Sequence, residues 1–232
     1  MHKSLLSAAA LALAVVAPLA HAHTEGDIIL RAGAITVNPK ADSSSVKVDQ
    51  GPLAGANLGG KATMSSDTQL GLNFAYMITD HVGIELLAAT PFEHDVKLKG
   101  TALSAANGKL GSLKHLPPTL SVVYYPLDSK SVFQPYVGAG INYTWIYDEH
   151  VGSSASAAGF DNFKAKNSWG MAFQIGADYM LTDNILINAQ ARYIDIDTRA
   201  TVENNAVAPG TRAKVNVDVD PFVYMVGVGY KF

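Results

Sequence analysis

Apolar and polar residues alternate along almost the whole chain from residue 26 onward, and this pattern constrains the fold more than any other feature. In the clearest run, residues 67–79, Leu70 and Leu72 share one face while Gln69 lies on the other. A two-residue period predicts β-strands with two different faces. Eight strands are predicted, at residues 26–38, 67–79, 82–98, 114–127, 133–147, 168–182, 184–202 and 212–232.

The connections between these strands alternate strictly in length. Short turns lie at residues 79–81, 127–132 and 182–184, whereas long connections rich in small and polar residues cover 39–66, 99–113, 148–167 and 203–211. A soluble sandwich has no reason to sort its connections in this way, but a bacterial outer-membrane barrel has short periplasmic turns and long extracellular loops. The predicted fold class is therefore all-β: an eight-stranded antiparallel transmembrane β-barrel.

The composition excludes several other classes of protein. Charged residues make up 16% of the 232 residues, against about 25% in ordinary soluble domains. The 17 basic and 20 acidic residues leave no basic excess for nucleic acid, and the absence of cysteine excludes disulfides and thiolate metal sites. No apolar run reaches the roughly 20 residues of a membrane-spanning helix.

The N-terminal segment predicts export. Lys3 supplies a positive charge, residues 5–16 form a short apolar run, and Ala20 and Ala22 form an A-x-A cleavage site. We expect residues 1–22 to be a cleaved signal peptide and residues 23–232 to form the barrel, located in the bacterial outer membrane.

Aromatic residues on the apolar faces sort by height into two groups, as the interfacial girdles of a membrane barrel do. The upper group is Trp145, Tyr147, Trp169, Tyr193 and Phe222, and the lower group is Tyr76, Tyr124, Phe133, Tyr179, Tyr230 and Phe232. The last strand alternates up to Tyr230 and Phe232, a pattern typical of the signal that outer-membrane assembly machinery recognises. Ordinary core aromatics of a soluble protein are the alternative.

The face opposite the apolar one is polar at bilayer height. Its predicted lumen residues are Arg31, Gln69, Asn73, Glu85, Gln134, Asn142, Gln174, Asp178, Asn188, Gln190, Arg192 and Lys231. Because an eight-stranded barrel is filled by its own side chains, we expect Arg31, Arg192 and Lys231 to pair with Glu85 and Asp178 in a lumen plug. A water-filled pore is the alternative.

Above the upper girdle the polarity inverts. Asp195, Asp197, Asn216, Asp218, Asp220 and Thr36 face outward, and Ile35, Val37, Ile194, Ile196, Val215, Val217 and Val219 face inward. An apolar concavity closed beneath by polar groups is typical of a small-ligand pocket. These seven inward residues are the predicted apolar vestibule, although a dry core that steadies the wall fits the pattern equally well.

Three prolines interrupt neighbouring strands at similar height. Pro91 lies in the third strand, and Pro117 and Pro118 lie in the fourth. Because proline cannot donate to a ladder, we expect a bulge that also turns Val96 and Leu98 inward. The break is either a lateral exit into the membrane or simply the end of strand pairing.

Catalytic and metal chemistry are weakly represented. His94, Asp95 and His115 are expected near the rim, but no strand places a histidine and a serine together in the membrane band, so we expect no enzyme activity. The pairs Asp195/Asp197 and Asp218/Asp220 suit either Ca²⁺ or simple solvation of the outer wall. No cofactor is expected.

The sequence resembles the OmpW family of small outer-membrane proteins, most closely its OprG-like branch. The matching segments are DTQLGL from residue 67, ATPF from 89, LPPTL from 116, QPYVGAG from 134, NYT from 142, SWG from 168, DYML from 178, YIDIDT from 193 and VDVDPFVYMVGVGYKF from 217. The resemblance implies an eight-stranded barrel whose hydrophobic extracellular channel does not run through to the periplasm.

We therefore expect passive uptake of small hydrophobic molecules through the vestibule, with lateral exit into the membrane. The expected partners are outer-membrane lipid, small hydrophobic solutes and the assembly machinery. The alternatives are a surface-interaction barrel that presents its extracellular loops and, less favoured, a channel for small polar solutes.

Overall fold

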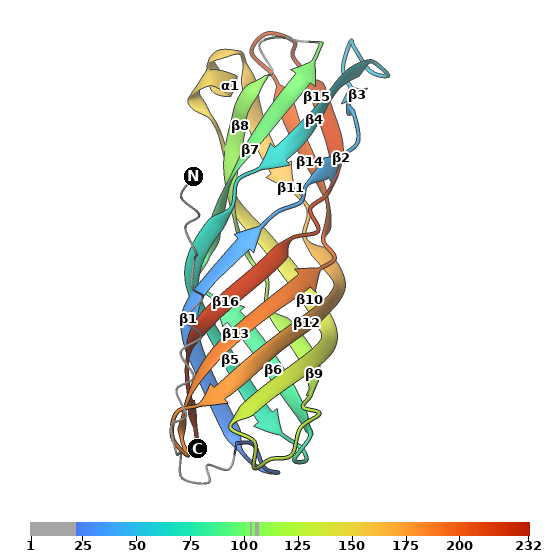
Figure 1. Cartoon of the computed structure of the whole chain (residues 1–232). Helices are drawn as coiled ribbons and strands as arrows, with labels where there is room; N and C mark the ends of the chain where they lie inside the picture. The colour runs from blue at the N-terminus through green and yellow to red at the C-terminus, as the bar shows by residue number, and fades with distance from the viewer. Residues whose placement is uncertain (1–21, 103, 105–106) are drawn as a thin grey trace, which may run out of the picture.

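The computed structural model describes residues 22–102, 104 and 107–232 as a tall β-barrel (Figure 1). The predicted signal peptide lies outside the described residues except for Ala22 and remains a prediction. Among the described residues, no helix is long and apolar enough to cross a membrane. The short helix α1 (Ser153–Ala157) lies at the upper end in Figure 1.

The lower half is a closed antiparallel barrel of eight strands, which we call the membrane barrel. Its strands are β1 (Ile28–Asn38), β5 (Asp67–Met77), β6 (Val82–Ala89), β9 (Thr119–Tyr124), the first part of β10 (Phe133–Val151), β12 (Ser168–Met180), β13 (Ile185–Ile194) and β16 (Phe222–Lys231). Pairing of the first and last strands, from Ile29 with Lys231 to Asn38 with Phe222, closes the ring. The predicted fold class is confirmed.

The upper half continues this wall as a second set of strands, which we call the upper barrel. In order around the wall it contains the end of β10, β8 (Gly108–Leu116), β7 (Phe92–Thr101), β4 (Asn57–Met64), β3 (Val46–Gln50), β15 (Thr211–Asp218), β14 (Asp197–Asn204) and β11 (Phe160–Ala165). The two-residue strand β2 (Asp42–Ser43) pairs with β15. Two hydrogen bonds from backbone to side chain link β10 to the β11 region. The N–H of Ala165 donates to Glu149 Oε1 over 3.2 Å, and the N–H of Ile146 donates to Asn167 Oδ1 over 2.8 Å.

Two sequence-based expectations about these elements are wrong. The predicted loops 39–66 and 148–167 contain wall strands, and 99–113 falls largely within the ends of β7 and β8. The predicted strands 184–202 and 212–232 are each broken into two, between Ile194 and Asp197 and between Asp218 and Phe222. The predicted strands 82–98 and 114–127 are also divided, but at the prolines where the sequence predicts an interruption. The eight predicted crossings themselves are correct.

The outer face of the membrane barrel is a continuous apolar belt. The exposed side chains there include Leu70, Leu72, Phe74, Leu120 and Ile175. Soluble proteins rarely expose so large a continuous apolar surface to water. Exposed Trp145, Trp169 and Phe222 lie at its upper edge, and exposed Tyr76, Tyr179 and others lie at its lower edge. Such a belt between two aromatic girdles is typical of a barrel surrounded by lipid.

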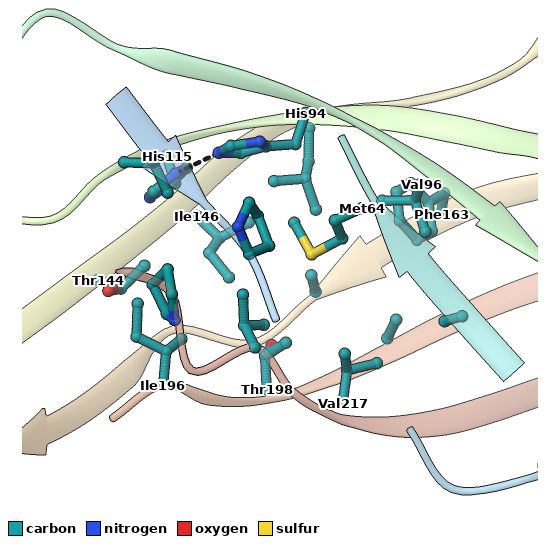
Figure 2. Close-up of a pocket in the computed structure, with 18 residues that line it drawn as sticks. Met64, His94, Val96, His115, Thr144, Ile146, Phe163, Ile196, Thr198 and Val217 are labelled. Carbon is teal, nitrogen blue, oxygen red and sulfur yellow. Dashed lines mark hydrogen bonds between the residues drawn. The ribbon is translucent and has the colours of Figure 1, made fainter. Parts of the chain in front are cut away.

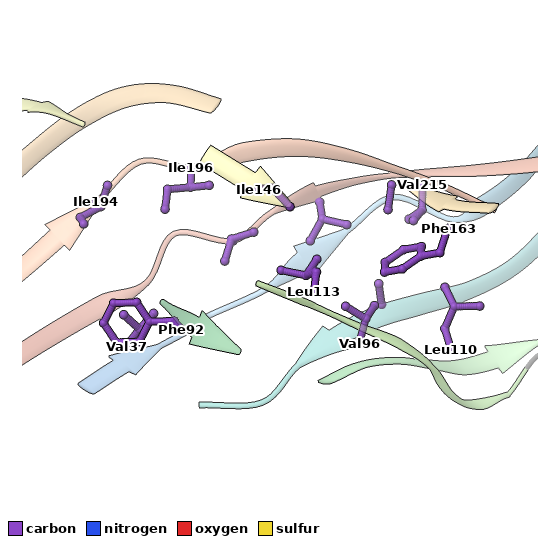
Figure 3. Close-up of a cluster of buried hydrophobic side chains, with 14 of the residues drawn as sticks. Val37, Phe92, Val96, Leu110, Leu113, Ile146, Phe163, Ile194, Ile196 and Val215 are labelled. Carbon is purple, nitrogen blue, oxygen red and sulfur yellow. The ribbon is translucent and has the colours of Figure 1, made fainter. Parts of the chain in front are cut away.

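The interior is layered by polarity. A large apolar cluster fills the upper barrel (Figure 3), and a smaller one, which includes Ile29, Met77, Tyr125 and Leu186, lies at the periplasmic end. Charged and amide side chains separate the two clusters. Val96 and Leu98 belong to the upper cluster, as the sequence predicts. Inward side chains have odd numbers in β6 and even numbers in β7, so the inward register shifts at Thr90 and Pro91.

Candidate functional site

Arg31 is the centre of the polar layer. Its Nε donates to Asp178 Oδ1 over 3.0 Å, its Nη1 to Asn73 Oδ1 over 2.9 Å, and its Nη2 to the Tyr125 hydroxyl over 2.9 Å. Arg31 and Asp178 are fully buried. Because a buried guanidinium is stable only when paired and hydrogen-bonded, these contacts fix its position across the lumen.

A second ion pair lies beside the first. Arg192 Nη2 donates to Glu85 Oε1 over 2.6 Å, and Gln174 Nε2 donates to the same oxygen over 2.9 Å. Arg31 Nη1 lies 3.6 Å from Glu85 Oε2 and joins the two pairs. The structure thus brings together Arg31, Glu85, Asp178 and Arg192, which we call the lumen plug.

Two residues of this layer differ from the sequence-based expectation. Lys231 is not placed against Glu85 or Asp178; its Nζ lies 3.7 Å from Asp27 Oδ2, at the periplasmic end of the barrel. His23 was not predicted to take part, yet its Nε2 lies 2.9 Å from Asp178 Oδ2. Sequence alternation gives no signal for His23, because it precedes the first strand.

All seven predicted vestibule residues point into the upper barrel and are buried. Val37, Ile194, Ile196 and Val215 are labelled among the clustered side chains in Figure 3. Their neighbours in the cluster include Val96, Leu110, Leu113, Ile146 and Phe163. Most of the concavity expected from sequence is therefore filled by side chains of β7, β8, β10 and β11.

A small apolar cavity remains within this cluster (Figure 2). Val37, Ile196, Val217 and Val219 line it, together with Met64 and other residues of the upper strands, whereas Ile35, Ile194 and Val215 pack outside its lining. Its volume is about 40 Å³, compared with about 150 Å³ for an apolar cavity that binds benzene. A solute of that size therefore needs lining side chains to move.

Two histidines line the cavity, together with two threonines, Thr144 and Thr198. His94 and His115 are buried, and their Nε2 atoms lie 2.8 Å apart. His94 Nδ1 lies 2.5 Å from the carbonyl oxygen of Ser65, and Phe92 stacks on His115 with ring centroids 5.3 Å apart. Burial lowers the pKa of His94, and burial beside His94 lowers the pKa of His115 to about 3. Both rings are therefore neutral at physiological pH.

The expected neighbours of this pair lie elsewhere. The side chain of Asp95 forms an ion pair with Lys109, with Oδ1 and Nζ 2.6 Å apart. Ser65 contributes its carbonyl to His94, while its hydroxyl oxygen accepts from the backbone N–H of Asp95. The two histidines meet as anticipated, but without the serine–histidine geometry of a hydrolase.

The predicted prolines lie at an interruption of the wall. Between β6 and β9 the ladder ends at Leu87 with Thr119, and between β7 and β8 it begins at Phe92 with His115. In the described part of the chain no ladder pair joins residues 88–91 to residues 116–118, and we call this the proline break. Pro117 is buried, whereas Pro91 and Pro118 are exposed.

Asn142 stabilises the backbone at the proline break. Its Nδ2 donates to the carbonyl oxygens of Pro117 and Pro118, both over 3.1 Å, and to Thr119 Oγ1 over 2.9 Å. The hydroxyl of Thr144 donates to Asn142 Oδ1 over 2.7 Å and fixes the amide orientation. The sequence places Asn142 in the lumen, but does not reveal these partners.

Comparison with known proteins identifies the family. The protein-family model of the OmpW family matches residues 24–232 of this sequence. The chain belongs to the OmpW family. It is 42% identical over 232 residues to outer membrane protein W of Vibrio cholerae, with 100% of both chains covered. It is 40% identical over 230 residues to outer membrane protein W of Escherichia coli K12, with 98% of this chain and 99% of the relative covered.

A solved structure supports the same family. The crystal structure of OprG from Pseudomonas aeruginosa has a TM-score of 0.84 and 48% sequence identity to this chain, and the match covers 91% of this chain and 98% of OprG. This OmpW-family protein is thus an outer-membrane barrel, and its apolar belt is the lipid-facing surface.

The C-terminal aromatics of this OmpW-family barrel lie in the lower girdle. Tyr230 and Phe232 are exposed, with ring centroids 4.7 Å apart. The backbone N–H of Phe232 donates to the carbonyl of Ile28 over 2.9 Å. Their role as an assembly signal remains a prediction.

Acidic residues gather on the exterior of the upper barrel. Asp195, Asp197 and Asp220 bring carboxylate oxygens within 4.8 Å of one another. Partial burial, followed by repulsion from Asp195, Asp218 and Asp220, raises the pKa of Asp197. The two sequence-based alternatives, Ca²⁺ binding and solvation of the wall, both fit this arrangement.

Proposed function

We propose that this protein mediates passive uptake of small hydrophobic molecules across the outer membrane. A solute enters the upper barrel from outside, lodges in the apolar vestibule and leaves sideways through the proline break into the membrane. The observation that carries the proposal is the position of the apolar cavity, above a charged plug and beside an interruption of the wall. No catalytic step is needed for this route.

The lumen plug supports a lateral rather than a straight path. Its two arginines and two carboxylates are almost fully buried and joined to one another. Separating buried partners leaves uncompensated charge, which costs about 3–5 kcal/mol for each broken pair. An apolar solute gains nothing in return, because the layer that it would enter is polar.

The proline break supplies a route of lower resistance. Phe92 and His115 are the first paired residues above it, and their stacked rings lie on the inner side of the wall. Passage requires side-chain rearrangement rather than the loss of ladder hydrogen bonds, since residues 88–91 and 116–118 form none with each other. Met64, an unbranched and adaptable side chain, lines the same cavity.

Solute flux into lipopolysaccharide-containing vesicles, measured for solutes of graded hydrophobicity, tests the proposal. Ala200 lines the cavity, so Ala200→Val adds two methyl groups to it and should slow apolar flux several-fold. Ala139 is exposed on the lipid-facing surface of β10, and Ala139→Val is the matched control. Faster passage of apolar solutes in the parent, lost only in Ala200→Val, supports uptake. No flux of any solute contradicts it and favours the surface-interaction alternative, and preferred passage of polar solutes favours a polar channel.

A further inference from the structure

The hydrogen bonds of the histidine pair fix which ring nitrogens carry protons. The carbonyl oxygen of Ser65 can only accept, so His94 Nδ1, 2.5 Å away, must carry a proton. A neutral imidazole carries one proton, which leaves a lone pair on His94 Nε2. His115 Nε2, 2.8 Å from that lone pair, must therefore be the donor.

This assignment determines the chemistry of the remaining nitrogen. In neutral His115 the only proton is on Nε2, so Nδ1 has a lone pair and accepts hydrogen bonds. That atom is buried and has no hydrogen-bond partner among the described residues. Buried polar atoms are satisfied in most proteins, and an unsatisfied one needs an explanation.

The surroundings keep both rings neutral. Phe92 stacks on His115. Apart from the two histidines, the cavity lining is apolar except for Thr144 and Thr198, whose hydroxyls donate to Asn142 Oδ1 and to the carbonyl oxygen of Lys166. Asp67 is the one acidic group that acts on both histidines, and its carboxylate is already bound by the backbone N–H of Glu93 and the amide of Gln69. Burial dominates for each ring, so the pKa of each is lowered.

We propose that the vestibule is selective for apolar solutes that carry a single hydroxyl, such as aliphatic alcohols or phenols, whose O–H donates to His115 Nδ1. This inference rests on the proposed function, because it uses the same vestibule. The apolar lining receives the hydrocarbon part, and the ring nitrogen receives the one polar hydrogen. An ether or a carboxylate of the same size has no proton to donate, and His115 Nδ1 then stays unsatisfied.

Two isomers of one composition test the proposal. 1-Hexanol and methyl pentyl ether contain the same atoms, but only the alcohol is a donor. Binding to the purified protein in lipid nanodiscs is measured by calorimetry and corrected for partition into protein-free nanodiscs. One added hydrogen bond predicts about 3- to 10-fold tighter binding of the alcohol. Equal binding overturns the selectivity but leaves the proposed uptake standing, whereas binding of neither isomer contradicts the proposed uptake itself.

His115→Phe identifies the group responsible. Phenylalanine keeps a ring against Phe92 but has no acceptor, so the preference for the alcohol should disappear while the ether binds as before. His150 is exposed and outside the cavity lining, and His150→Phe is the matched control that should keep the preference. A preference that survives in His115→Phe assigns the acceptor to another residue and overturns the proposal.

Nitrogen NMR of the parent protein, labelled with ¹⁵N at histidine, gives a measurement that does not depend on the folding of a variant. We expect protonated Nδ1 in His94, unprotonated Nδ1 in His115, and a shift of the His115 Nδ1 resonance on addition of 1-hexanol but not of the ether. A protonated His115 Nδ1, or a resonance that responds equally to both isomers, overturns the proposal.

Discussion

At the proline break, where ladder hydrogen bonds are missing, side chains bond the backbone instead, and Asn142 is the clearest case. Its amide is a donor to the carbonyls of Pro117 and Pro118, and its carbonyl accepts from Thr144. Asn142→Leu has similar size but leaves buried polar groups unpaired, so it should lower the free energy of unfolding by about 1–3 kcal/mol. Urea unfolding in micelles measures the loss. Gln50→Leu, at an exposed position, should change stability by no more than about 0.5 kcal/mol. If both substitutions lowered the free energy of unfolding by the same small amount, the structure of the proline break would not depend on Asn142.

The histidine pair predicts a pH dependence of the upper barrel. The pKa of His115 is about 3 in the folded protein, and that of an exposed histidine is about 6.5. Above pH 6.5 both states are neutral and stability is unaffected. As the pH falls from 6.5 toward 3, only the opened state takes up the proton, so stability falls, by on the order of 4 kcal/mol at pH 3.

Hydrogen exchange, corrected for its intrinsic pH dependence, measures this effect. Amides of β7 and β8 should lose protection between pH 7 and 4, amides of β13 should not, and His115→Phe should remove most of the difference. Equal loss in β7, β8 and β13 would show that the titrating groups lie elsewhere.

At the scale of elements, the alternating pattern predicted the crossings because each strand separates lipid from lumen. It could not predict β3 and β4, where short alternating stretches such as residues 46–50 are interrupted by glycines at 51, 55, 59 and 60. Above the bilayer the outer face of the wall meets water instead of lipid. Strands there lack the outward-facing apolar residues by which the membrane crossings were predicted. The breaks within 184–202 and 212–232 had no such signal, because the inward parity of β13–β14 and β15–β16 continues across them. The breaks within 82–98 and 114–127 were marked by their prolines.

The break between β6 and β7 predicts the behaviour of a proline variant. Pro91→Ala restores a backbone N–H, which lets residues 88–91 pair with the neighbouring strand. Each regained hydrogen bond adds roughly 0.5–1.5 kcal/mol, so the variant should be at least as stable as the parent while it passes apolar solutes more slowly. Flux and ion conductance should be measured together, since an opened pore would raise conductance. Pro126→Ala, in a periplasmic turn, is the matched control. Apolar flux at the parent rate in folded Pro91→Ala would rule out an exit at this position.

At the scale of the whole molecule, one closed wall reverses its polarity along its axis. The membrane barrel is apolar outside and polar inside, and the upper barrel is the opposite. Residue parity alone predicts this reversal and the inward direction of the seven candidate vestibule residues, but not which four of them line the cavity. It does not predict which lumen groups meet, because Arg31 and Asp178 are 147 positions apart and approach only when the barrel closes. The same holds for His94 with His115 and for the filling of the vestibule by Phe163 from a predicted loop.

The C-terminal strand predicts a separation between folding and cellular assembly. Phe232 is exposed to lipid, and its structural contribution is one backbone hydrogen bond to Ile28 and a ring contact with Tyr230. Deleting Phe232 should therefore change refolding of the purified chain into micelles only slightly, as measured by the shift in gel mobility on boiling. If the assembly machinery recognises this residue, the same deletion should lower the amount inserted into the outer membrane of cells several-fold, while export to the periplasm stays normal. Leu53→Ala, at an exposed residue in the loop between β3 and β4, is the control and should insert as the parent does. Equal insertion of the parent and the truncated chain would remove the assembly role of the last strand, and failure of both refolding and insertion would assign Phe232 to barrel closure.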